Sequence, residues 1–171
     1  MTSSQRSSIE RPKAGLSQLA AKLIQLQEKA SECDLNNDTA GTLKSLLHEL
    51  RLLLCNHETD CPEVADSVFR IGLAYYELPD FALAKFYLDL AAKMFIKLKI
   101  LNNLTDCLDY AGKIEVELGH YASAIQYYQE AVDVLRKRCE TETNECYSTM
   151  LRKRMGNFNR RMGELLSLVD Y

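Results

Sequence analysis

The residues with the clearest capacity for chemistry are three potential metal ligands that lie close together in the chain. Cys55, His57 and Cys61 fall within seven residues, in a polar turn between two apolar stretches. Thiolates and imidazoles are ligands that Zn²⁺ accepts, so this group has the chemistry to begin a zinc site. The sequence offers no fourth ligand, and the spacing matches no common zinc finger. We therefore expect a buried Cys55, a surface His57 and no bound metal.

The two other histidines do not indicate catalysis. His48 lies within an apolar helical pattern and His120 lies at a turn, and neither has a Ser or Cys nucleophile directly beside it. The chain also contains no glycine-rich phosphate loop, carboxylate motif or nucleophile elbow. We therefore expect a protein that is not an enzyme, with no catalytic residues and no cofactor.

Composition and charge set the class of protein. The chain has 171 residues, of which 47% are hydrophobic, and its formal net charge is −3. It has no uncharged apolar run of about eighteen residues, which predicts a soluble single domain without a membrane span. A net charge this small gives no reason to expect nucleic acid as a partner.

The start of the chain and its cysteines indicate the compartment. Residues 1–13 are polar, so we expect a disordered tail there rather than a signal peptide. The six cysteines include no C-x-x-C pair. We interpret them as reduced thiols of a cytoplasmic protein, with a nuclear location as the alternative.

The elements that position all these residues follow a repeated pattern between Val68 and Arg136. Gly72 recurs as Gly112, at an offset of 40 residues. The same offset relates Phe81 to Tyr121, Ala84 to Ala124, Leu88 to Tyr128 and Ala91 to Ala131. A period of this length is typical of stacked similar units rather than of one closed core.

Each copy of the pattern predicts a pair of helices, because its apolar residues recur at steps of three and four. In the first copy the first helix must end near Leu78, since Pro79 cannot continue it. In the second copy Gly119 is suited to a left-handed helix cap. We expect Gly72 and Gly112 to be contact points at which the two helices of a pair come close.

Six residues of the second copy follow a known order of small and large positions: Gly112, Gly119, Tyr121, Ala124, Tyr128 and Ala131. In this order the copy resembles the tetratricopeptide repeat. Two departures are Pro79 in place of the turn glycine of the first copy and Glu115 in place of the usual aromatic of the second. The offset exceeds the roughly 34 residues of ordinary repeats. It resembles the long-helix subgroup found in polarity adaptors, kinesin light chains and, more distantly, the soluble attachment proteins of membrane fusion.

The resemblance implies an all-α solenoid of about seven antiparallel helices, stacked as hairpins in a right-handed superhelix. We expect a repeat domain over residues 14–171. Its first hairpin, 14–56, lacks the glycine and alanine signature and is interpreted as a degenerate repeat. Two repeats follow at 60–101 and 102–139, with the break between them expected near Asn102 and Asn103.

The last segment, 142–169, contains Gly156 and Gly163, which repeat the spacing of Gly112 and Gly119. We interpret this segment as a truncated third repeat, and a capping helix or a fragment of a longer array are the alternatives. Thr141 to Asn144 separate it from the preceding helix.

In tetratricopeptide arrays the first helix of each pair lines a concave groove, which holds a peptide or helix of a partner. The resemblance places three sets of residues there: Asp66, Phe69, Leu73 and Tyr76, then Asp106, Asp109, Lys113 and Val116, then Met150, Lys153, Asn157 and Arg160. This predicts an apolar first half and a basic last half, suited to an acidic or amphipathic segment. The alternative is that Phe69 and Leu73 pack against the preceding hairpin and that the charges are a solvated face. The pattern that captures chaperone tails is not met in the first repeat, so that function is not implied.

A second candidate surface consists of basic residues near the end of the chain: Arg136, Lys137, Arg138, Arg152, Lys153, Arg154, Arg160 and Arg161. It has the charge to meet an acidic partner, phosphoinositide headgroups or RNA. Glu140, Glu142 and Glu145 dilute the cluster, and no aromatic residues alternate with it. We favour a solvated face.

Two functions are therefore open. The first is a scaffold or adaptor that binds a partner peptide or helix in its groove. The second is a structural subunit of a larger assembly, such as a lid-type or vesicle-trafficking complex, that uses its end helices. Apolar surface exposed in the groove favours the first, and apolar surface exposed on the end helices favours the second.

Overall fold

A computed structural model describes residues 38–56 and 61–169, together with Gln25, Glu28 and Glu32, which are helical. The predicted tail at 1–13 and most of the first expected helix lie outside the described residues. Within the described part of the chain the structure consists of helices and their connections, without a strand, so the predicted all-α class is confirmed. The helices are α2 (Thr39–Asn56), α3 (Pro62–Glu77), α4 (Phe81–Leu98), α5 (Leu101–Glu117), α6 (Tyr121–Thr141) and α7 (Glu145–Val169). None of them is long and apolar enough to cross a membrane.

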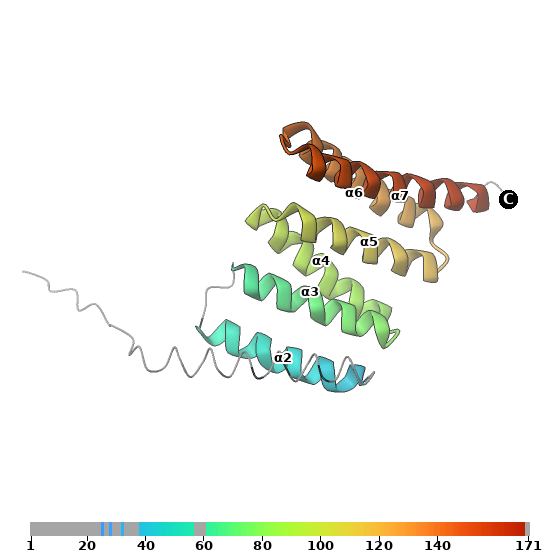
Figure 1. Cartoon of the computed structure of the whole chain (residues 1–171). Helices are drawn as coiled ribbons and strands as arrows, with labels where there is room; N and C mark the ends of the chain where they lie inside the picture. The colour runs from blue at the N-terminus through green and yellow to red at the C-terminus, as the bar shows by residue number, and fades with distance from the viewer. Residues whose placement is uncertain (1–24, 26–27, 29–31, 33–37, 57–60, 170–171) are drawn as a thin grey trace, which may run out of the picture.

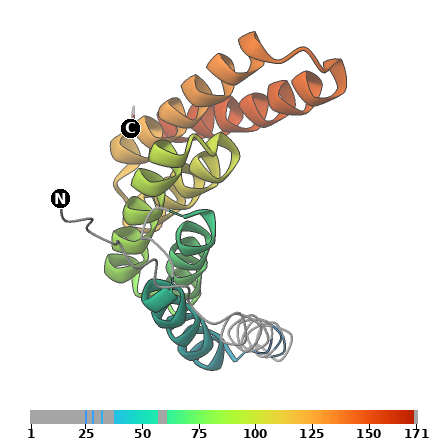
Figure 2. The same ribbon diagram turned by 90° about the vertical axis from the view of Figure 1, so that its left-hand side faces the viewer.

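The helices are stacked in the order of the chain (Figure 1). α3 with α4 and α5 with α6 form hairpins, and the second helix of each hairpin also packs against the first helix of the next unit. Figure 2 shows that the stack is curved. One apolar core runs through it from Leu53 on α2 to Leu165 on α7, and it includes the fully buried Phe95, Leu135 and Leu151. This arrangement is an α-solenoid, in which each unit is stabilised mainly by its neighbours.

A glycine lies at the closest approach of the two helices in each hairpin, as predicted. A Cβ atom on Gly72 would lie 3.1 Å from Leu88 Cγ and 3.2 Å from the Leu88 backbone nitrogen. A Cβ atom on Gly112 would lie 2.5 Å from Tyr128 Cε1, and Tyr128 is buried. Both large side chains therefore occupy the space that a side chain on the glycine would need.

The turns inside the hairpins also agree with the sequence. α3 ends at Glu77, before Leu78 and Pro79. α5 ends before Gly119, which has a φ of +75° and takes the left-handed conformation that glycine accepts without steric cost. The N-terminal end of α4 is capped by Asp80, whose carboxylate accepts a hydrogen bond from the Leu83 backbone N–H at 3.2 Å.

The predicted break at Asn102 and Asn103 is wrong, because both residues belong to the first turn of α5. The break lies instead at Lys99 and Ile100. Lys99 has a φ of 59°, and its backbone N–H donates to the Ile96 carbonyl, which closes the end of α4. A lysine in the left-handed region has no sequence signal comparable to that of glycine or proline, so the pattern placed the break too late.

α7 is one uninterrupted helix that begins after the predicted separating segment, Thr141 to Asn144. At its start the Asn144 side chain accepts a hydrogen bond from the Tyr147 backbone N–H at 3.1 Å. Gly163 lies inside this helix. It does not mark a helix end, whereas Gly119 directly follows the end of α5. In α3 and α5 the face that carries Gly72 or Gly112 packs against the second helix of the hairpin. The corresponding face of α7, around Gly156, is exposed and largely polar, with Thr149, Arg152 and Asn159. A polar outer face is typical of a capping helix. The division of residues 14–171 into repeats and a cap stays a prediction.

The two kinds of glycine give a matched prediction for stability. Gly112→Ala should destabilise the protein by about 1–3 kcal/mol, because the new methyl group would force the buried Tyr128 ring to move. Gly156→Ala should instead stabilise it by up to about 1 kcal/mol, because this site is an exposed helix interior with no atom within 4 Å of the added Cβ. Urea denaturation measures both changes. Equal effects of the two substitutions would contradict the packing described here.

Candidate protein-binding surface

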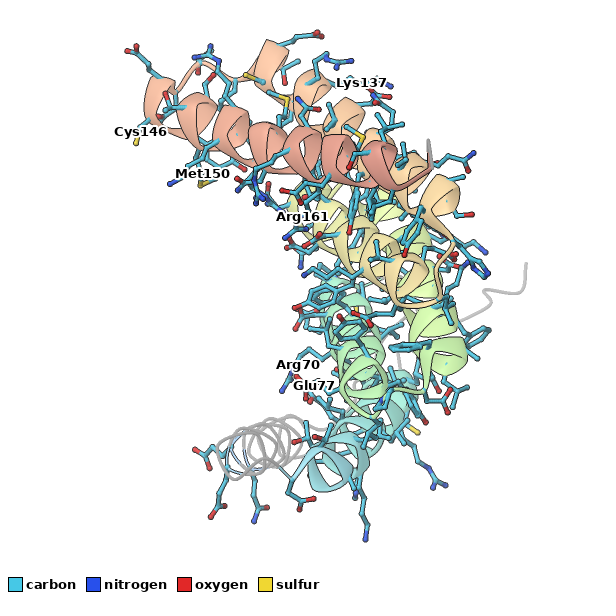
Figure 3. All side chains as sticks on the ribbon, turned by 90° about the vertical axis from the view of Figure 1, so that its right-hand side faces the viewer. Arg70, Glu77, Lys137, Cys146, Met150 and Arg161 are labelled. Atoms are coloured by element: carbon cyan, nitrogen blue, oxygen red, sulfur yellow. The ribbon has the colours of Figure 1, made fainter. Side chains whose placement is uncertain are left out.

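The first helix of each unit faces the inside of the curve. Figure 3 shows Arg70 and Glu77 of α3, and Met150 and Arg161 of α7, on this inner side. Leu73 lies between Arg70 and Glu77 in helical register, and Asn157 lies one turn before Arg161. Residues of α3 and α7 that belong to or border the predicted groove row thus lie on one concave side, and the role of this row in binding stays a prediction.

The α3 end of this face is a cluster of aromatic rings. The Phe69 and Tyr110 rings lie 6.2 Å apart and the Tyr76 and Tyr110 rings lie 5.5 Å apart, both edge to face. The Tyr76 ring also lies 6.1 Å from the Phe81 ring. Each ring is half-buried, with one side packed on the core around Ala84. The rings are therefore held in place by the fold while part of each remains accessible.

Tyr110 was not among the predicted groove residues. It occupies the register position of Arg70 in the preceding unit, one residue beyond Asp109. The sequence does contain a signal that could have found it. Arg70, Tyr110 and Arg154 occupy the same position in successive units, directly beside the predicted row. The two apolar groove residues Leu73 and Val116 are also half-buried and contribute to the core.

The charges of the concave face are largely paired with one another. Asp109 of α5 accepts from Arg161 of α7 and from Lys113 at 3.0 Å, and Asp106 accepts from Arg154 at 2.5 Å. Lys113 also lies over the Tyr110 ring, 4.1 Å from its centroid. The contacts of Arg154 and Arg161 join α7 to α5 across the groove. Of the basic residues in these pairs only Lys113 was assigned to the groove from the sequence, and the two arginines of α7 were not among the predicted groove residues.

The predicted groove residues of α7 differ in whether their side chains are paired. Arg160 pairs with Glu164 at 2.7 Å along the helix. Lys153 and Asn157 are exposed, and so is Met150. The exposed positive charge of the groove is therefore concentrated near Lys153.

Asp66, at the α3 end of the face, has a raised pKa because burial disfavours its charged form, and Arg70 only partly offsets this. Arg70 itself pairs with the buried Glu49 of α2 at 3.3 Å. Arg70 is thus engaged within the fold.

The basic residues near the end of the chain do not form one patch. Arg154 and Arg161 face the groove, as described above. Arg138 lies on α6, 3.7 Å from Glu142 and 6.0 Å from the centre of the Tyr147 ring. Arg136 pairs with Asp133 at 2.9 Å. This division agrees with the interpretation of separate solvated charges.

Large apolar side chains are exposed mainly outside the groove. Phe86 and Ile96 of α4 are the most exposed, at 61% and 59%, and Leu166 and Leu168 are exposed near the end of α7. From the predicted groove, Met150 alone belongs to this set. The other exposed members are Leu47, Leu54, Leu78, Leu83, Leu90 and Leu118.

The sites that the sequence offered for metal and thiol chemistry are dispersed. Cys55 is exposed on the solvent face of α2, so the expectation that it is buried is wrong, and His57 lies outside the described residues. Among the described residues no three His, Cys, Asp or Glu side chains are placed to hold a metal ion. The described cysteines are free thiols, and burial raises the pKa of Cys107 to about 12, which keeps this thiol protonated.

Comparison with known proteins agrees with this geometry. Residues 111–134 match the tetratricopeptide repeat family. Among solved structures, the chain resembles the Rap conjugation gene regulator of the plasmid pLS20, which was determined in complex with the Phr* peptide. The TM-score is 0.71 at 13% identity, over 98% of this chain and 43% of that protein. The chain thus spans less than half the length of the regulator. No curated protein sequence matches this chain.

The fold and these matches support a helical array that resembles the tetratricopeptide-repeat type, and such arrays are folds of protein interaction. The predicted resemblance to this repeat is confirmed, and the assignment to its long-period subgroup stays a prediction. At 13% identity the likeness to the regulator is a likeness of fold.

The second hairpin departs from the repeat pattern through a buried ionic cluster. In the first hairpin the Tyr75 and Tyr87 rings stack 5.4 Å apart. In the second hairpin Glu115 occupies the position of Tyr75, is buried, and accepts hydrogen bonds from Lys85 of α4 and from His120, whose Nδ1 lies 3.0 Å from the carboxylate. Burial raises the pKa of Glu115, but the hydrogen bonds with Lys85 and His120 outweigh it, so the pKa is lowered overall. The cluster joins α4, α5 and the start of α6.

This cluster predicts a pH-dependent contribution to stability. Glu115→Gln should destabilise the protein by about 1.5–3 kcal/mol at pH 7, toward the lower value because Lys85 and His120 are partly screened by water. Because the pKa of Glu115 is lowered on folding, its contribution is present above pH 4.5, the ordinary value, and is lost as the pH falls below it. Urea denaturation from pH 7 to pH 3 checks this. The control is Glu117→Gln, the same change at an exposed site two residues on, and a pH-independent difference for Glu115→Gln would contradict the assignment.

Proposed function

We propose that this protein is a non-enzymatic scaffold or adaptor that binds a peptide or helix of another protein on its concave face. The observation that carries the proposal is the partly exposed ring cluster of Phe69, Tyr76 and Tyr110 on that face. Rigid aromatic side chains in partly desolvated positions are the usual anchors of protein interfaces. Here the fold holds the rings before any partner arrives, which lowers the entropy cost of binding.

The partner class follows from the two ends of the groove. The rings near α3 offer apolar contact, and the exposed Lys153 near α7 attracts an acidic residue of the partner. The charges that are paired within the groove are expected to set direction and rate of association more than affinity. The proposed binding residues are Tyr110 and nine of the residues expected from the sequence: Phe69, Leu73, Tyr76, Asp109, Lys113, Val116, Lys153, Asn157 and Arg160.

Two observations support a segment rather than a whole domain as the ligand. The Rap regulator, which shares the fold, was determined with a peptide bound. In addition, the first helices of a solenoid form an extended concave surface that suits an elongated ligand. We further propose a cytoplasmic or nuclear setting for this interaction, because the described cysteines are free thiols.

The second candidate function is a structural subunit of a larger assembly. Leu166 and Leu168, both about half exposed near the end of α7, favour it, because exposed apolar residues on an end helix suit an assembly contact. The two functions differ in which surface the partner covers.

Two surface variants separate these functions. Asn157→Trp places a bulky ring in the groove without touching the core, and Leu166→Glu with Leu168→Glu disrupts the exposed end of α7. Partners are identified by co-purification of the wild-type protein, and their retention is then measured for each variant at equal protein concentration. We expect Asn157→Trp to reduce retention at least tenfold and the double variant to leave it unchanged. The reverse result would assign the protein to the assembly function.

Within the groove, the aromatic anchors should matter more than the paired charge. Phe69→Ala with Tyr76→Ala should weaken capture of that partner more than Lys113→Gln, which removes a charge already paired with Asp109. Circular dichroism establishes that the variants remain folded. A larger effect of Lys113→Gln would contradict the anchor assignment.

A further inference from the structure

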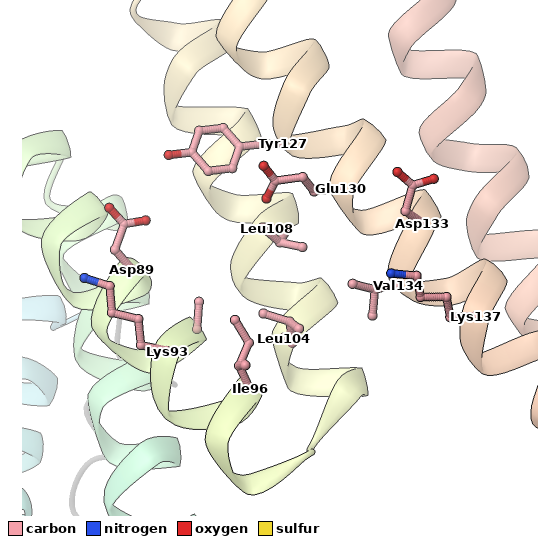
Figure 4. A pocket seen from close by; sticks show the side chains of 11 residues that line it. Asp89, Lys93, Ile96, Leu104, Leu108, Tyr127, Glu130, Asp133, Val134 and Lys137 are labelled. Atoms are coloured by element: carbon pink, nitrogen blue, oxygen red, sulfur yellow. The ribbon is translucent and has the colours of Figure 1, made fainter.

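A second groove lies on the opposite side of the array, between α4 and α6. It has a volume of about 470 Å³. Figure 4 shows its floor, to which Leu104 and Leu108 of α5 contribute, with Ile96 and Val134 at the sides. Lys137, which lines it, lies on the outer side of the curve in Figure 3. This groove is therefore separate from the concave face.

The groove exists because α4 and α6 both pack on α5 while their own backbones stay apart. Their side chains meet at one end of the groove, where Lys85 Nζ of α4 lies 5.6 Å from the centre of the Tyr127 ring of α6. Their backbones do not approach within 8 Å between Cα atoms, whereas each packs closely against α5. Ala92 is too short to close the gap from the α4 side. As a result Leu104 and Leu108 of α5, although buried, line the bottom of the groove, and Ile96 is 59% exposed at its edge.

The charges on the two rims follow the direction of the helices. Asp89 and Glu130 lie near the middle of α4 and α6, at the end of the groove next to Tyr127, and Lys93 and Lys137 follow one to two turns later (Figure 4). Asp133, between them, is engaged by Arg136 at 2.9 Å and by Gln129 at 3.1 Å. The groove thus has an acidic end and a basic end over an apolar floor.

The length and charge of the groove fit one kind of ligand. From Tyr127 to Lys137 the rim runs along ten residues of helix, about 15 Å or three helical turns. A helix that carries acidic residues in its first turn and basic residues in its last turn has the charge order that its own dipole favours. Seated antiparallel to α4 and α6, such a helix places its acidic start over Lys93 and Lys137 and its basic end over Asp89 and Glu130.

We propose that this outer groove binds an amphipathic helix of a partner protein, antiparallel to α4 and α6, with an apolar anchor over Leu104, Leu108 and Val134. The anchor is a leucine or phenylalanine of the partner, in the manner of a helix laid into an apolar groove. A chain with the concave face and this groove would bind two partners on opposite sides. The inference does not depend on the function proposed for the concave face.

The test uses the full chain and a synthetic helical probe. The probe is a hydrocarbon-stapled peptide of about fourteen residues, with glutamates in its first turn, leucines along one face and lysines in its last turn. A second peptide replaces the leucines with glutamines. Binding is followed by ¹H–¹⁵N NMR shifts. We expect saturable shifts at Leu104, Leu108 and Val134 with the first peptide and none with the second.

Two variants of α4 form a matched pair for this test. Ile96→Glu changes an exposed residue of the groove, and Phe86→Glu makes the same kind of change at an exposed residue of α4 that does not line the groove. We expect Ile96→Glu to raise the dissociation constant of the probe at least tenfold and Phe86→Glu to leave it within twofold. A spin label on the first residue of the probe should broaden the resonances of Lys93 and Lys137 rather than that of Tyr127.

Several outcomes would overturn the proposal. The first is the absence of a saturable shift up to about 1 mM probe, a concentration that corresponds to weak binding of about 4 kcal/mol. The second is a set of shifts confined to the concave face, and the third is an equal effect of the two variants. Broadening at Tyr127 would overturn the antiparallel orientation. Groove resonances that shift on dilution of the protein alone would assign the groove to a second copy of the chain instead.

Discussion

The contact between a glycine and a large side chain inside each hairpin is the constraint on which the rest of the structure depends. Gly72 against Leu88, and Gly112 against Tyr128, bring two helices together at one defined point. With that crossing fixed, the first helix of each hairpin faces the inside of the curve and the second helix faces the outside. The concave face and the outer groove are both consequences of this arrangement, because the first helices line the concave face and the second helices α4 and α6 form the rims of the groove over α5.

The polar contacts add connections that the glycine contacts do not provide. The buried Glu115 draws Lys85 of one hairpin to the next, and Arg161 draws α7 to Asp109 of α5. An ion pair of this kind offsets the desolvation of its charges only when its hydrogen bonds are well placed, so it specifies geometry more than it adds stability. In the groove these same pairs use charge that would otherwise be available to a partner. On energetic grounds we therefore expect the accessible rings to contribute more to a partner's affinity than the charged residues do.

Much of the fold could be predicted from the sequence, because backbone and packing requirements leave periodic signals. The offset of Gly72 and Gly112, the stop at Pro79 and the left-handed Gly119 each reflect a local steric rule. The end of α4 at Lys99 could not be predicted in this way, since lysine reaches the left-handed region only through its surroundings. For the same reason the exposure of Cys55 was missed, because burial depends on neighbouring helices and not on residue type.

The candidate sites were less predictable than the fold. The helical register placed the groove row on α3, α5 and α7, but it could not show that Arg154 and Arg161 pair with Asp106 and Asp109 or that Tyr110 closes the ring cluster. These ion pairs join residues of different helices that are 48 and 52 positions apart in the sequence. The outer groove left no recognisable pattern in the sequence. It is a gap between α4 and α6 over side chains of α5, and in the pattern of a single helix these side chains look like core residues.

The measurement that tests the central claim most directly is site-specific photo-crosslinking in cells. The photoreactive amino acid p-benzoylphenylalanine replaces Asn157 on the concave face in one variant and Phe86 on the outside of α4 in another. The crosslinked peptides are identified by mass spectrometry. If the concave face holds a partner segment, the probe at Asn157 crosslinks to one short stretch of one protein, and the probe at Phe86 does not reach that stretch. Crosslinks to the same stretch from Phe86, with none from Asn157, would contradict the account.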